Sequence, residues 1–561
     1  MDWLKAQAHS RPHALALLFG NQTWTYRELD AWVDEWCGRV ASLGLTVGDR
    51  LGLCLPNTPA TVALVHAAAR LGLILVPLNT RLTEREMAWQ MEQTGCRVVI
   101  SELSTVSSEQ LAVSSEQLAV SSQQLAVSSK QLAVTSDQSL VSNLSVSQSP
   151  SLPVSQSPVH HSQFTIHHSP FTIDQLRSLS PTPFSPAPFS LDTLQAIIFT
   201  SGTTGQPKGA MLTFGNHFWS AAASAFRLGV LPDDRWLTCL PLYHVGGQAI
   251  LFRSALYGTT VVLQQGFDPE RINHSLDNDQ ITLVSLVPTM LHRLLDSRTH
   301  WPNSLRLILL GGAAADPDLI HRANTLQHFS LSASQPAKTR NSELETQNSP
   351  LVAPTYGLSE AASQVATILP SEAQVKPGTV GKPLLFTTIR IADEQGQSLP
   401  PGEIGEVVIK GPTVMLGYWQ NPEATAKTIR DGELFTGDLG YLDGDSDLWL
   451  VQRRSDLIVT GGENVYPAEV ENVLKQHPGV AAACVVGIPH HQWGQLVSAL
   501  IVPQPGHTPT PEELITFARQ HLAGYKIPRH IQFTDHLPQT ASGKIERHAV
   551  QKQLQTLSPS A

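Results

Sequence analysis

The sequence predicts an α/β fold, with a large N-terminal domain followed by a smaller unit. Between residues 50 and 78, short apolar strands alternate with helix-like spans, which is the rhythm of an α/β unit. Three later apolar runs, LQAIIFT (194–200), TLVSLVP (282–288) and LRLILLGG (305–312), are typical of buried strands. The large domain is therefore expected to be built from α/β subdomains.

The smaller unit has secondary structure of its own near the end of the chain. PAEVENVLKQH (467–477) reads as a helix, and AACVVGIP (482–489) and SALIVP (498–503) read as strands. We place the boundary near Ser455, which predicts a C-terminal α+β domain over residues 455–561.

Two polar insertions interrupt the large domain. From Ser107 a heptapeptide, SSEQLAV, repeats and then decays into a stretch rich in Ser, Gln and Pro. Its apolar residues lack the three–four spacing of a coiled coil, and such a composition cannot bury enough surface to offset its ordering entropy. We expect a disordered insertion over 105–187 and a second insertion over 328–350, which leaves 1–104 and 188–454 as the large domain.

Composition excludes several classes of protein. The 561 residues carry a net charge of −10, and no basic run with interleaved aromatics occurs, so nucleic acid is not an expected partner. The five cysteines form no CxxC pair, which argues against a zinc site or a disulfide framework. The N-terminus lacks an apolar signal region, and no apolar run approaches the roughly 20 residues of a membrane span. We expect a cytoplasmic protein without membrane insertion; its oligomeric state is not written in the sequence.

The segment TSGTTGQPKG (200–209) follows a predicted strand and has the composition of a phosphate-binding loop. Glycines allow close backbone approach, hydroxyls and backbone N–H groups can bind an anion, and a lysine adds charge. It lacks the G-K-[ST] ending of the kinase and GTPase loop. The candidate ligands are Thr200, Ser201, Gly202, Thr203, Thr204, Gly205 and Lys208.

Three further segments supply the remaining polar groups. PTYGLSE (354–360) combines an aromatic side chain with the carboxylate of Glu360, and LFTGDLGYLD (434–443) presents Asp438 just past a glycine, at an expected turn. LPQTASGKIER (537–547) places Lys544 in a Ser-Gly turn. A lone lysine in such a turn is usually solvated, so Lys544 is a candidate site residue only because the other motifs accompany it.

Taken in order, these motifs, with RRSDLIVTGGENVYPAEVE (453–471), resemble those of the acyl-adenylate-forming superfamily of AMP-dependent synthetases and ligases. The resemblance covers nearly the whole chain except the two insertions. It implies a β-barrel-like subdomain in the large domain and a mobile C-terminal domain. It also implies attack of a carboxylate on the α-phosphate of ATP, followed by displacement of AMP by the thiol of CoA. GNHFWSA (215–221) and RRSDLI (453–458) are most similar to bacterial CoA ligases that act on an aryl dicarboxylic acid in quinone synthesis.

The resemblance assigns roles to the ATP site. Lys544 would bridge the substrate carboxylate and the α-phosphate, Mg²⁺ near Glu360 would neutralise the phosphates, and Thr204 and Lys208 would hold pyrophosphate. The adenosine contacts implied by the family are Tyr356 beside adenine, Gly311 and Gly312 in the pocket wall, Gly357 and Ser359 of the YG-x-T-E motif, and Asp438 and Arg453 at the ribose. Ser359 stands where the family usually has Thr, so the hydroxyl is retained.

The acid and CoA sites are assigned in the same way. His244 lies where the family places a gate beside the acyl pocket, although a buried core histidine is the alternative. Arg253 is the candidate for the second carboxylate, against the alternative of a surface arginine on an amphipathic helix. Ser455 is the expected hinge, and Gly461 and Gly462 are expected to line the CoA tunnel. A CoA ligase for another aryl or fatty acid, and a binding module without catalysis, are the competing functions.

Overall fold

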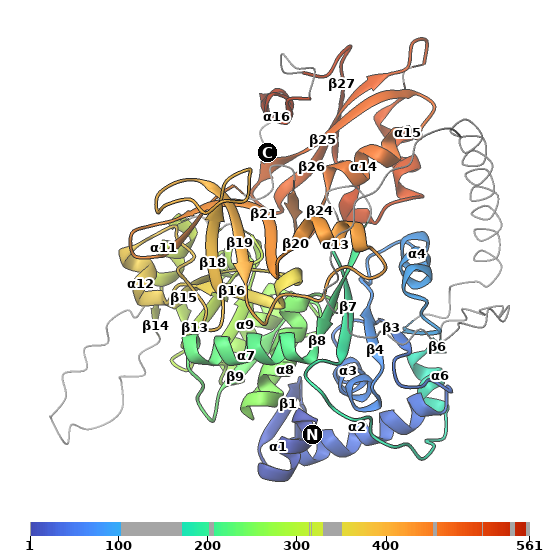
Figure 1. Cartoon of the computed structure of the whole chain (residues 1–561), viewed down its shortest axis with the longest axis vertical. Helices are drawn as coiled ribbons and strands as arrows, with labels where there is room; N and C mark the ends of the chain where they lie inside the picture. The colour runs from blue at the N-terminus through green and yellow to red at the C-terminus, as the bar shows by residue number, and fades with distance from the viewer. Residues whose placement is uncertain are drawn as a thin grey trace, which may run out of the picture.

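The computed structural model describes residues 2–102, 171–200, 207–313, 315, 317–328, 351–452, 457–507, 509–538 and 545–556. Figure 1 shows a large N-terminal body with the C-terminal segment, in red, against one side of it. Among the described helices, none has both the length and the apolar character needed to cross a bilayer.

The largest sheet has nine strands in the order β17-β16-β15-β13-β11-β9-β10-β1-β2, and its central pairs are parallel. The strands span Leu15–Phe19 (β1), Gln22–Thr25 (β2), Arg235–Thr238 (β9), Thr260–Leu263 (β10), Leu283–Leu286 (β11), Leu307–Leu310 (β13), Val352–Leu358 (β15), Ser363–Thr367 (β16) and Lys382–Pro383 (β17). All residues of β10, β11 and β13 are buried, as expected for parallel strands covered on both faces.

A second sheet has six strands in the order β6-β5-β3-β4-β7-β8. They span Arg50–Cys54 (β3), Ile74–Pro77 (β4), Val98–Ser101 (β5), Phe171–Thr172 (β6), Leu194–Thr200 (β7) and Lys208–Thr213 (β8). A further pair joins β12 (His300–Trp301) to β14 (Gln327–His328). The predicted runs 194–200, 282–288 and 305–312 thus contain β7, β11 and β13.

The helices of the large domain are α1 (Trp3–Ser10), α2 (Tyr26–Ala41), α3 (Pro59–Leu71), α4 (Glu84–Thr94), α6 (Ile173–Ser178), α7 (Phe214–Leu228), α8 (Val245–Tyr257), α9 (Pro269–Asn278), α10 (Pro288–Leu295), α11 (Pro317–Thr325), α12 (Pro370–Val375) and α13 (Pro422–Thr428). Sequence signals fix many of their ends. Thr25, Thr83 and Thr213 each begin a helix in a capping box, and Gly72 ends α3 in the left-handed conformation.

The expected insertion over 105–187 is too long at its C-terminal end. Residues 171–187 pack against the large domain: β6 pairs with β5, and Ile173 and Leu176 of α6 are buried. Thr172 begins α6 with a capping box, so a short helix forms here although the surrounding sequence is polar. The repeat itself and most of the second insertion lie outside the described residues.

The barrel-like subdomain of the expected fold corresponds to an antiparallel sheet of five strands. These are β18 (Thr388–Ala392), β19 (Gly405–Lys410), β20 (Ile429–Arg430), β21 (Glu433–Leu442) and β22 (Leu448–Gln452). Its inner face packs on β15 and β16, in one cluster that includes Tyr356 and Val407.

The C-terminal domain is an α+β unit with its own core, as expected. Its strands are β23 (Ile458–Thr460), β24 (Glu463–Val465), β25 (Val480–His490), β26 (Gly494–Pro503) and β27 (His530–Phe533), and its helices are α14 (Pro467–Leu474), α15 (Pro511–Arg519) and α16 (Arg547–Thr556). Two 3₁₀ turns, η1 (Ser359–Ala361) and η2 (Gly524–Lys526), reach the site described below. The proposed hinge, Ser455, lies outside the described residues.

Candidate active site

One cavity of about 610 Å³ lies between the large domain and the C-terminal domain. The loops after β9, β11 and β13 form part of its wall, at the carboxyl ends of parallel strands, where α/β proteins commonly bind ligands. The expected site residues that line it are Thr200, His244, Arg253, Gly311, Gly312, Gly357, Ser359, Glu360, Asp438, Gly461 and Gly462. Four distant motifs thus converge on one space.

The expected phosphate loop begins beside Glu360. Thr200 pairs with Lys208 across the β7–β8 hairpin, which holds the ends of the loop together. The Thr200 hydroxyl donates to Oε1 of Glu360 at 3.2 Å, and the Tyr418 hydroxyl donates to the same oxygen at 2.9 Å. Nζ of Lys208 lies 5.2 Å from the centroid of the Tyr418 ring. Ser201, Gly202, Thr203, Thr204 and Gly205 lie outside the described residues.

This donor set fits a magnesium–nucleotide complex. Mg²⁺ prefers oxygen ligands and is commonly held by one or two carboxylates together with substrate phosphates. Glu360 supplies one carboxylate at the cavity wall, directly beside the loop ends. Bound Mg²⁺ would neutralise phosphate charge, whereas Thr200 and Tyr418 orient the carboxylate.

Asp438 occupies a β-bulge in strand β21, and the turn expected around it is absent. The register between β19 and β21 shifts at this point, because Gly437 adopts φ 73°, a left-handed conformation that glycine accommodates without steric cost. Asp438 is buried, and its Oδ2 accepts a hydrogen bond of 2.6 Å from the Tyr356 hydroxyl. A buried carboxylate fixed in this way is suited to accept ribose hydroxyls.

Tyr356 itself has a different environment from the expected one. Its side chain is buried in the core cluster under the five-stranded sheet, and from there its hydroxyl donates a hydrogen bond to Asp438. Its stacking against adenine therefore stays a prediction. Gly357 is required by packing, because a Cβ there would lie 1.8 Å from the carbonyl oxygen of Ser363. Arg453 lies outside the described residues.

His244 is a cavity residue, so the alternative of a core histidine is excluded. It stands at the N-terminus of α8, its side chain is 41% exposed, and Nε2 lies 3.2 Å from Oε2 of Glu463. The Tyr243 hydroxyl donates to the other oxygen of Glu463 at 3.0 Å. Burial alone would raise the pKa of Glu463, but the hydrogen bond and charge of His244, with the charge of Arg81, outweigh it and lower that pKa.

Arg253 is buried in the middle of α8, so the alternative of a surface arginine is also excluded. It is 2% exposed, and within the described part of the chain no acidic side chain forms a salt bridge with it and its Nε has no acceptor. The guanidinium lies 5.5 Å from the Trp236 ring centroid and reaches the Ser220 hydroxyl only at 3.4 Å. Burial lowers its pKa. A buried, uncompensated cation at a cavity wall is suited to bind an anion.

Gly461 and Gly462 form the two-residue turn between β23 and β24. Their φ angles of 58° and 86° suit a tight hairpin turn in which both central residues are left-handed. A Cβ on Gly461 would lie 3.0 Å from the Trp493 ring. The turn, Trp493 and Tyr525 all line the cavity, so the C-terminal domain presents this face to the large domain. Lys544 lies outside the described residues.

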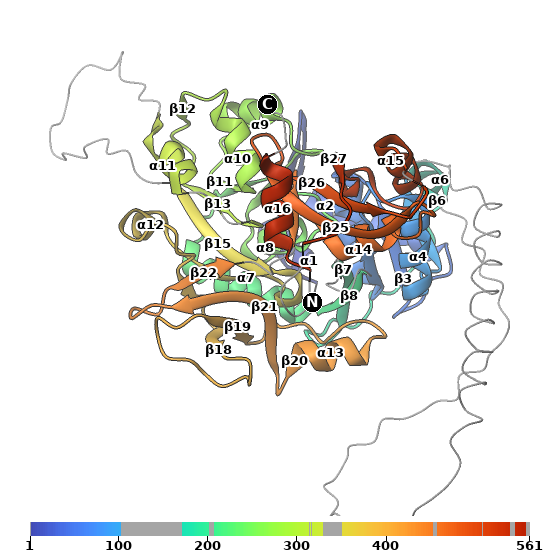
Figure 2. The same ribbon diagram turned by 90° about the horizontal axis from the view of Figure 1, so that it is seen from above.

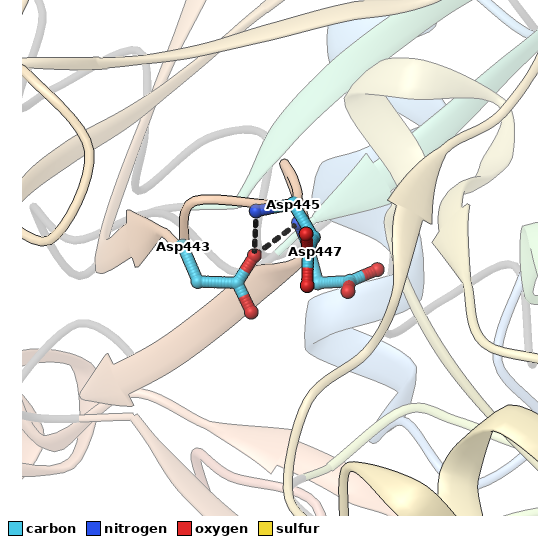
Figure 3. A group of neighbouring side chains, drawn as sticks. All are labelled: Asp443, Asp445 and Asp447. Carbon is cyan, nitrogen blue, oxygen red and sulfur yellow. Dashed lines mark hydrogen bonds between the residues drawn. The ribbon is translucent and has the colours of Figure 1, made fainter.

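A cluster of three carboxylates lies away from this cavity. Asp443, Asp445 and Asp447 occupy the loop between β21 and β22, and Figure 3 shows an oxygen of Asp443 accepting from the backbone N–H groups of the other two. Nζ of Lys376 donates to all three carboxylates at 2.6–3.0 Å. The ammonium group of Lys376 takes the position that a metal ion would have among the three carboxylates, so the cluster is a structural ion-pair network.

The chain matches the model of the AMP-binding enzyme family over residues 4–419, and that of the AMP-binding enzyme C-terminal domain over residues 469–544. The chain belongs to the AMP-binding enzyme family. It is 36% identical to the 2-succinylbenzoate–CoA ligase of Bacillus licheniformis over 548 residues, which cover 98% of each chain. The enzyme of that name from Geobacillus kaustophilus is 35% identical over 98% of this chain and 97% of its own length.

Solved structures of o-succinylbenzoate CoA synthetase from Bacillus subtilis share the fold of this AMP-binding enzyme. A double mutant bound to the product analogue OSB-NCoA superposes with a TM-score of 0.81 at 33% identity, covering 98% of both chains. The complex with the acyl-adenylate OSB-AMP gives 0.66, also at 33% identity, covering 98% and 97%. The TM-score is thus higher for the structure with the product analogue than for the acyl-adenylate complex.

Sequence reasoning missed several cavity residues of this AMP-binding enzyme. Glu463, Trp493, Tyr525 and Lys526 all come from the C-terminal domain. Glu463 could have been predicted from the sequence, because it is the acidic residue that directly follows the glycine pair of TGGENVYP. Trp493, Tyr525 and Lys526 lie in segments whose sequence shows no motif that indicates a site.

Proposed function

We propose that this chain is an AMP-forming acid–thiol ligase that converts 2-succinylbenzoate and CoA to 2-succinylbenzoyl-CoA, at the expense of ATP, in menaquinone or phylloquinone synthesis. Membership of the AMP-binding enzyme family and the names of its relatives support the chemistry. The assignment of the substrate rests on Arg253, a buried cation without an acidic partner among the described residues. It lies at the wall of the cavity that Glu360 and Asp438 also line.

In the first half-reaction, the succinyl carboxylate attacks the α-phosphorus of ATP and pyrophosphate leaves. Both reactants are anions, so the site must neutralise charge and align them. We assign Lys544 to the cation between the carboxylate and the α-phosphate, Glu360 to the magnesium complex, and Thr204 and Lys208 to pyrophosphate. Asp438, fixed by Tyr356, holds the ribose.

In the second half-reaction, the thiol of CoA attacks the acyl carbon and AMP leaves. The Gly461–Gly462 turn lies at the cavity without side chains that would obstruct a pantetheine chain. Glu463 contacts His244 beside the acyl pocket. We propose that the C-terminal domain turns about Ser455 between the two half-reactions, bringing Lys544 and this turn to the cavity alternately.

The competing fatty-acid ligase fits less well. An aliphatic chain would leave the guanidinium of Arg253 buried without a counter-ion, which is costly. The aryl carboxylate of 2-succinylbenzoate would supply that counter-ion. We also propose a cytoplasmic location, which the five unpaired cysteines support; four of them are fully buried as thiols.

A panel of acids tests the proposal. Pyrophosphate release and CoA-thioester formation are measured with 2-succinylbenzoate, with its monocarboxylic analogue 4-oxo-4-phenylbutanoate, and with a medium-chain fatty acid. The proposal expects the dicarboxylate to have the highest kcat/KM by at least about tenfold, the factor given by one charged hydrogen bond. A preference for the fatty acid would refute it, and so would pyrophosphate release without thioester from any acid.

A further inference from the structure

A buried lysine joins the two domains at the edge of the cavity. Lys526, the last residue of η2, has a side chain that is 3% exposed, and it lines the cavity. Its Nζ donates to Glu469 on α14 at 2.7 Å and to Glu86 on α4 at 2.6 Å. Glu469 belongs to the same domain as Lys526, whereas Glu86 belongs to the large domain. One of the two ion pairs therefore crosses the domain interface.

Glu86 is held in place by its own helix. It is the third residue of α4, and its Oε2 accepts hydrogen bonds of 2.8 Å from both the backbone N–H and the hydroxyl of Thr83. This capping box leaves Oε1 to accept from Lys526. The carboxylate is thus pre-oriented within the large domain, and the interdomain ion pair needs little further ordering.

The interdomain ion pair is tied to this arrangement of the domains. Burial opposes the charge of Lys526, but the carboxylates of Glu469 and Glu86 outweigh it and raise its pKa above the ordinary value. A buried ammonium that loses one of two carboxylates while it stays buried is strongly destabilised. Separation of the domains would instead expose both charges to water. The pair exists only in a domain arrangement that places Lys526 beside α4, so the free energy that it contributes stabilises this arrangement alone.

Neighbouring contacts come from the same part of the large domain, namely the loop between β4 and α4 and the first turn of α4. Asn79 donates to Glu463 at 3.2 Å, and Arg81 lies 3.4 Å from the other oxygen of that carboxylate. A guanidinium nitrogen of Arg85 lies 2.6 Å from Nδ1 of His521. Figures 1 and 2 both show α4 beside the C-terminal domain, so these contacts form one continuous polar interface.

We propose that Glu86 is a positioning residue for the CoA half-reaction: by pairing with Lys526 it selects the domain arrangement in which the Gly461–Gly462 turn faces the cavity. The proposal rests on the proposed function in its division of the reaction into two domain arrangements. Adenylation requires the C-terminal domain to present Lys544 instead, so it gains nothing from this ion pair. Loss of Glu86 then slows one half-reaction and spares the other.

Glu86→Gln tests this role with little risk to the fold. Glutamine serves the capping box as well as glutamate does, so α4 keeps its start while the charge is lost. Glu84→Gln is the matched control, because Glu84 is an exposed acid in the same first turn. Adenylation is measured as ATP–pyrophosphate exchange, and the second step as a single turnover of purified acyl-adenylate with CoA.

We expect Glu86→Gln to slow the CoA step by about tenfold or more, as for the loss of one charged hydrogen bond, with exchange changed by less than about twofold. Glu84→Gln changes neither step. Spin labels placed on α2 and α15 report the domain arrangement directly, and the population with the distance seen here should fall in Glu86→Gln. An equal loss in both steps, or an unchanged CoA step and unchanged distances, would overturn the proposal.

Failure of the proposed function gives a different result. If the wild-type enzyme does not activate 2-succinylbenzoate, the substrate assignment is refuted. The ratio of the two half-reactions in Glu86→Gln is then measured with the acid that the wild type does activate. The spin-label distances test the ion pair without any acid.

Discussion

Glu463 of the C-terminal domain lies 3.2 Å from His244 of the large domain, measured from Oε2 to Nε2, although 219 residues separate them in the chain. The contact places the turn of TGGENVYP directly beside the expected acyl gate. His244 therefore has a contact across the domain interface and does not serve only to pack the core. The contact therefore joins the C-terminal domain to a residue of the cavity wall.

Glu463→Gln should weaken the CoA step. The substitution keeps the shape of the side chain but removes the charge that faces His244 and Arg81. We expect a loss of about tenfold in the single-turnover rate with CoA, from the loss of a charge-assisted contact. ATP–pyrophosphate exchange should be retained. An unchanged CoA step would show that the contact is incidental.

The same contact predicts a pH dependence. The pKa of Glu463 is lower in the folded arrangement than in solvent, where a glutamate titrates at about 4.3. The charge of Glu463 therefore contributes fully above about pH 4.3, and its contribution is lost as the pH falls through the lower, folded value. Spin-label distances between the domains, followed from pH 7 downward, should show opening at acid pH. Glu463→Gln should lose this acid-side transition.

Arg253→Met tests recognition of the second carboxylate. Methionine fills the volume, and replacing an unpaired buried charge with an apolar side chain is not expected to destabilise the fold. We expect kcat/KM for 2-succinylbenzoate to fall by about 100-fold, because a buried ion pair with the substrate is lost. The value for 4-oxo-4-phenylbutanoate, which lacks the aryl carboxylate, should change by less than about threefold. Equal losses for the two acids would contradict the assignment.

Much of the site could be predicted because its residues lie in short local motifs. The run before Thr200 reads as a buried strand, and the hydroxyls, glycines and lysine that follow identify the loop by composition alone. The same holds for Glu360, Asp438 and the Gly461–Gly462 turn. The cavity residues His244, Arg253, Gly311 and Gly312 were instead expected only from the family resemblance.

The remaining features depend on contacts that no local pattern encodes. Lys526 and Glu86 are 440 residues apart, and neither residue type nor spacing indicates that they meet. The boundary of the first insertion was wrong for a related reason. Ile173 and Leu176 are too few to stand out in a polar stretch, and they become core residues only because the large domain covers them.

Leu176→Ala tests the corrected boundary of the insertion. Leu176 is fully buried in the largest core cluster, whereas Arg177 next to it is exposed. Truncation of a buried leucine costs about 2–5 kcal/mol of unfolding free energy, so the midpoint of urea denaturation should fall clearly. Arg177→Ala should leave it within experimental error. A stability unchanged in Leu176→Ala would restore the original boundary.

Lys376→Met tests whether the three aspartates form an ion-pair network. Lys376 carries the charge that balances Asp443, Asp445 and Asp447. We expect Ca²⁺ to leave the Tm of the wild type unchanged and to raise that of Lys376→Met, in which the carboxylates are free to bind a cation. An increase in Tm with Ca²⁺ in the wild type would instead indicate a resident metal site.

We propose that one ATP contacts both the glycine- and hydroxyl-rich loop and Lys544 of the C-terminal domain, and that this lysine acts in adenylation alone. Comparison of the two half-reactions in Lys544→Ala tests it most directly. We expect ATP–pyrophosphate exchange with 2-succinylbenzoate to fall by about 100-fold or more, because the bridging charge is lost, while purified acyl-adenylate still reacts with CoA at nearly the wild-type rate. Equal damage to both half-reactions, or full exchange activity in the variant, would contradict it.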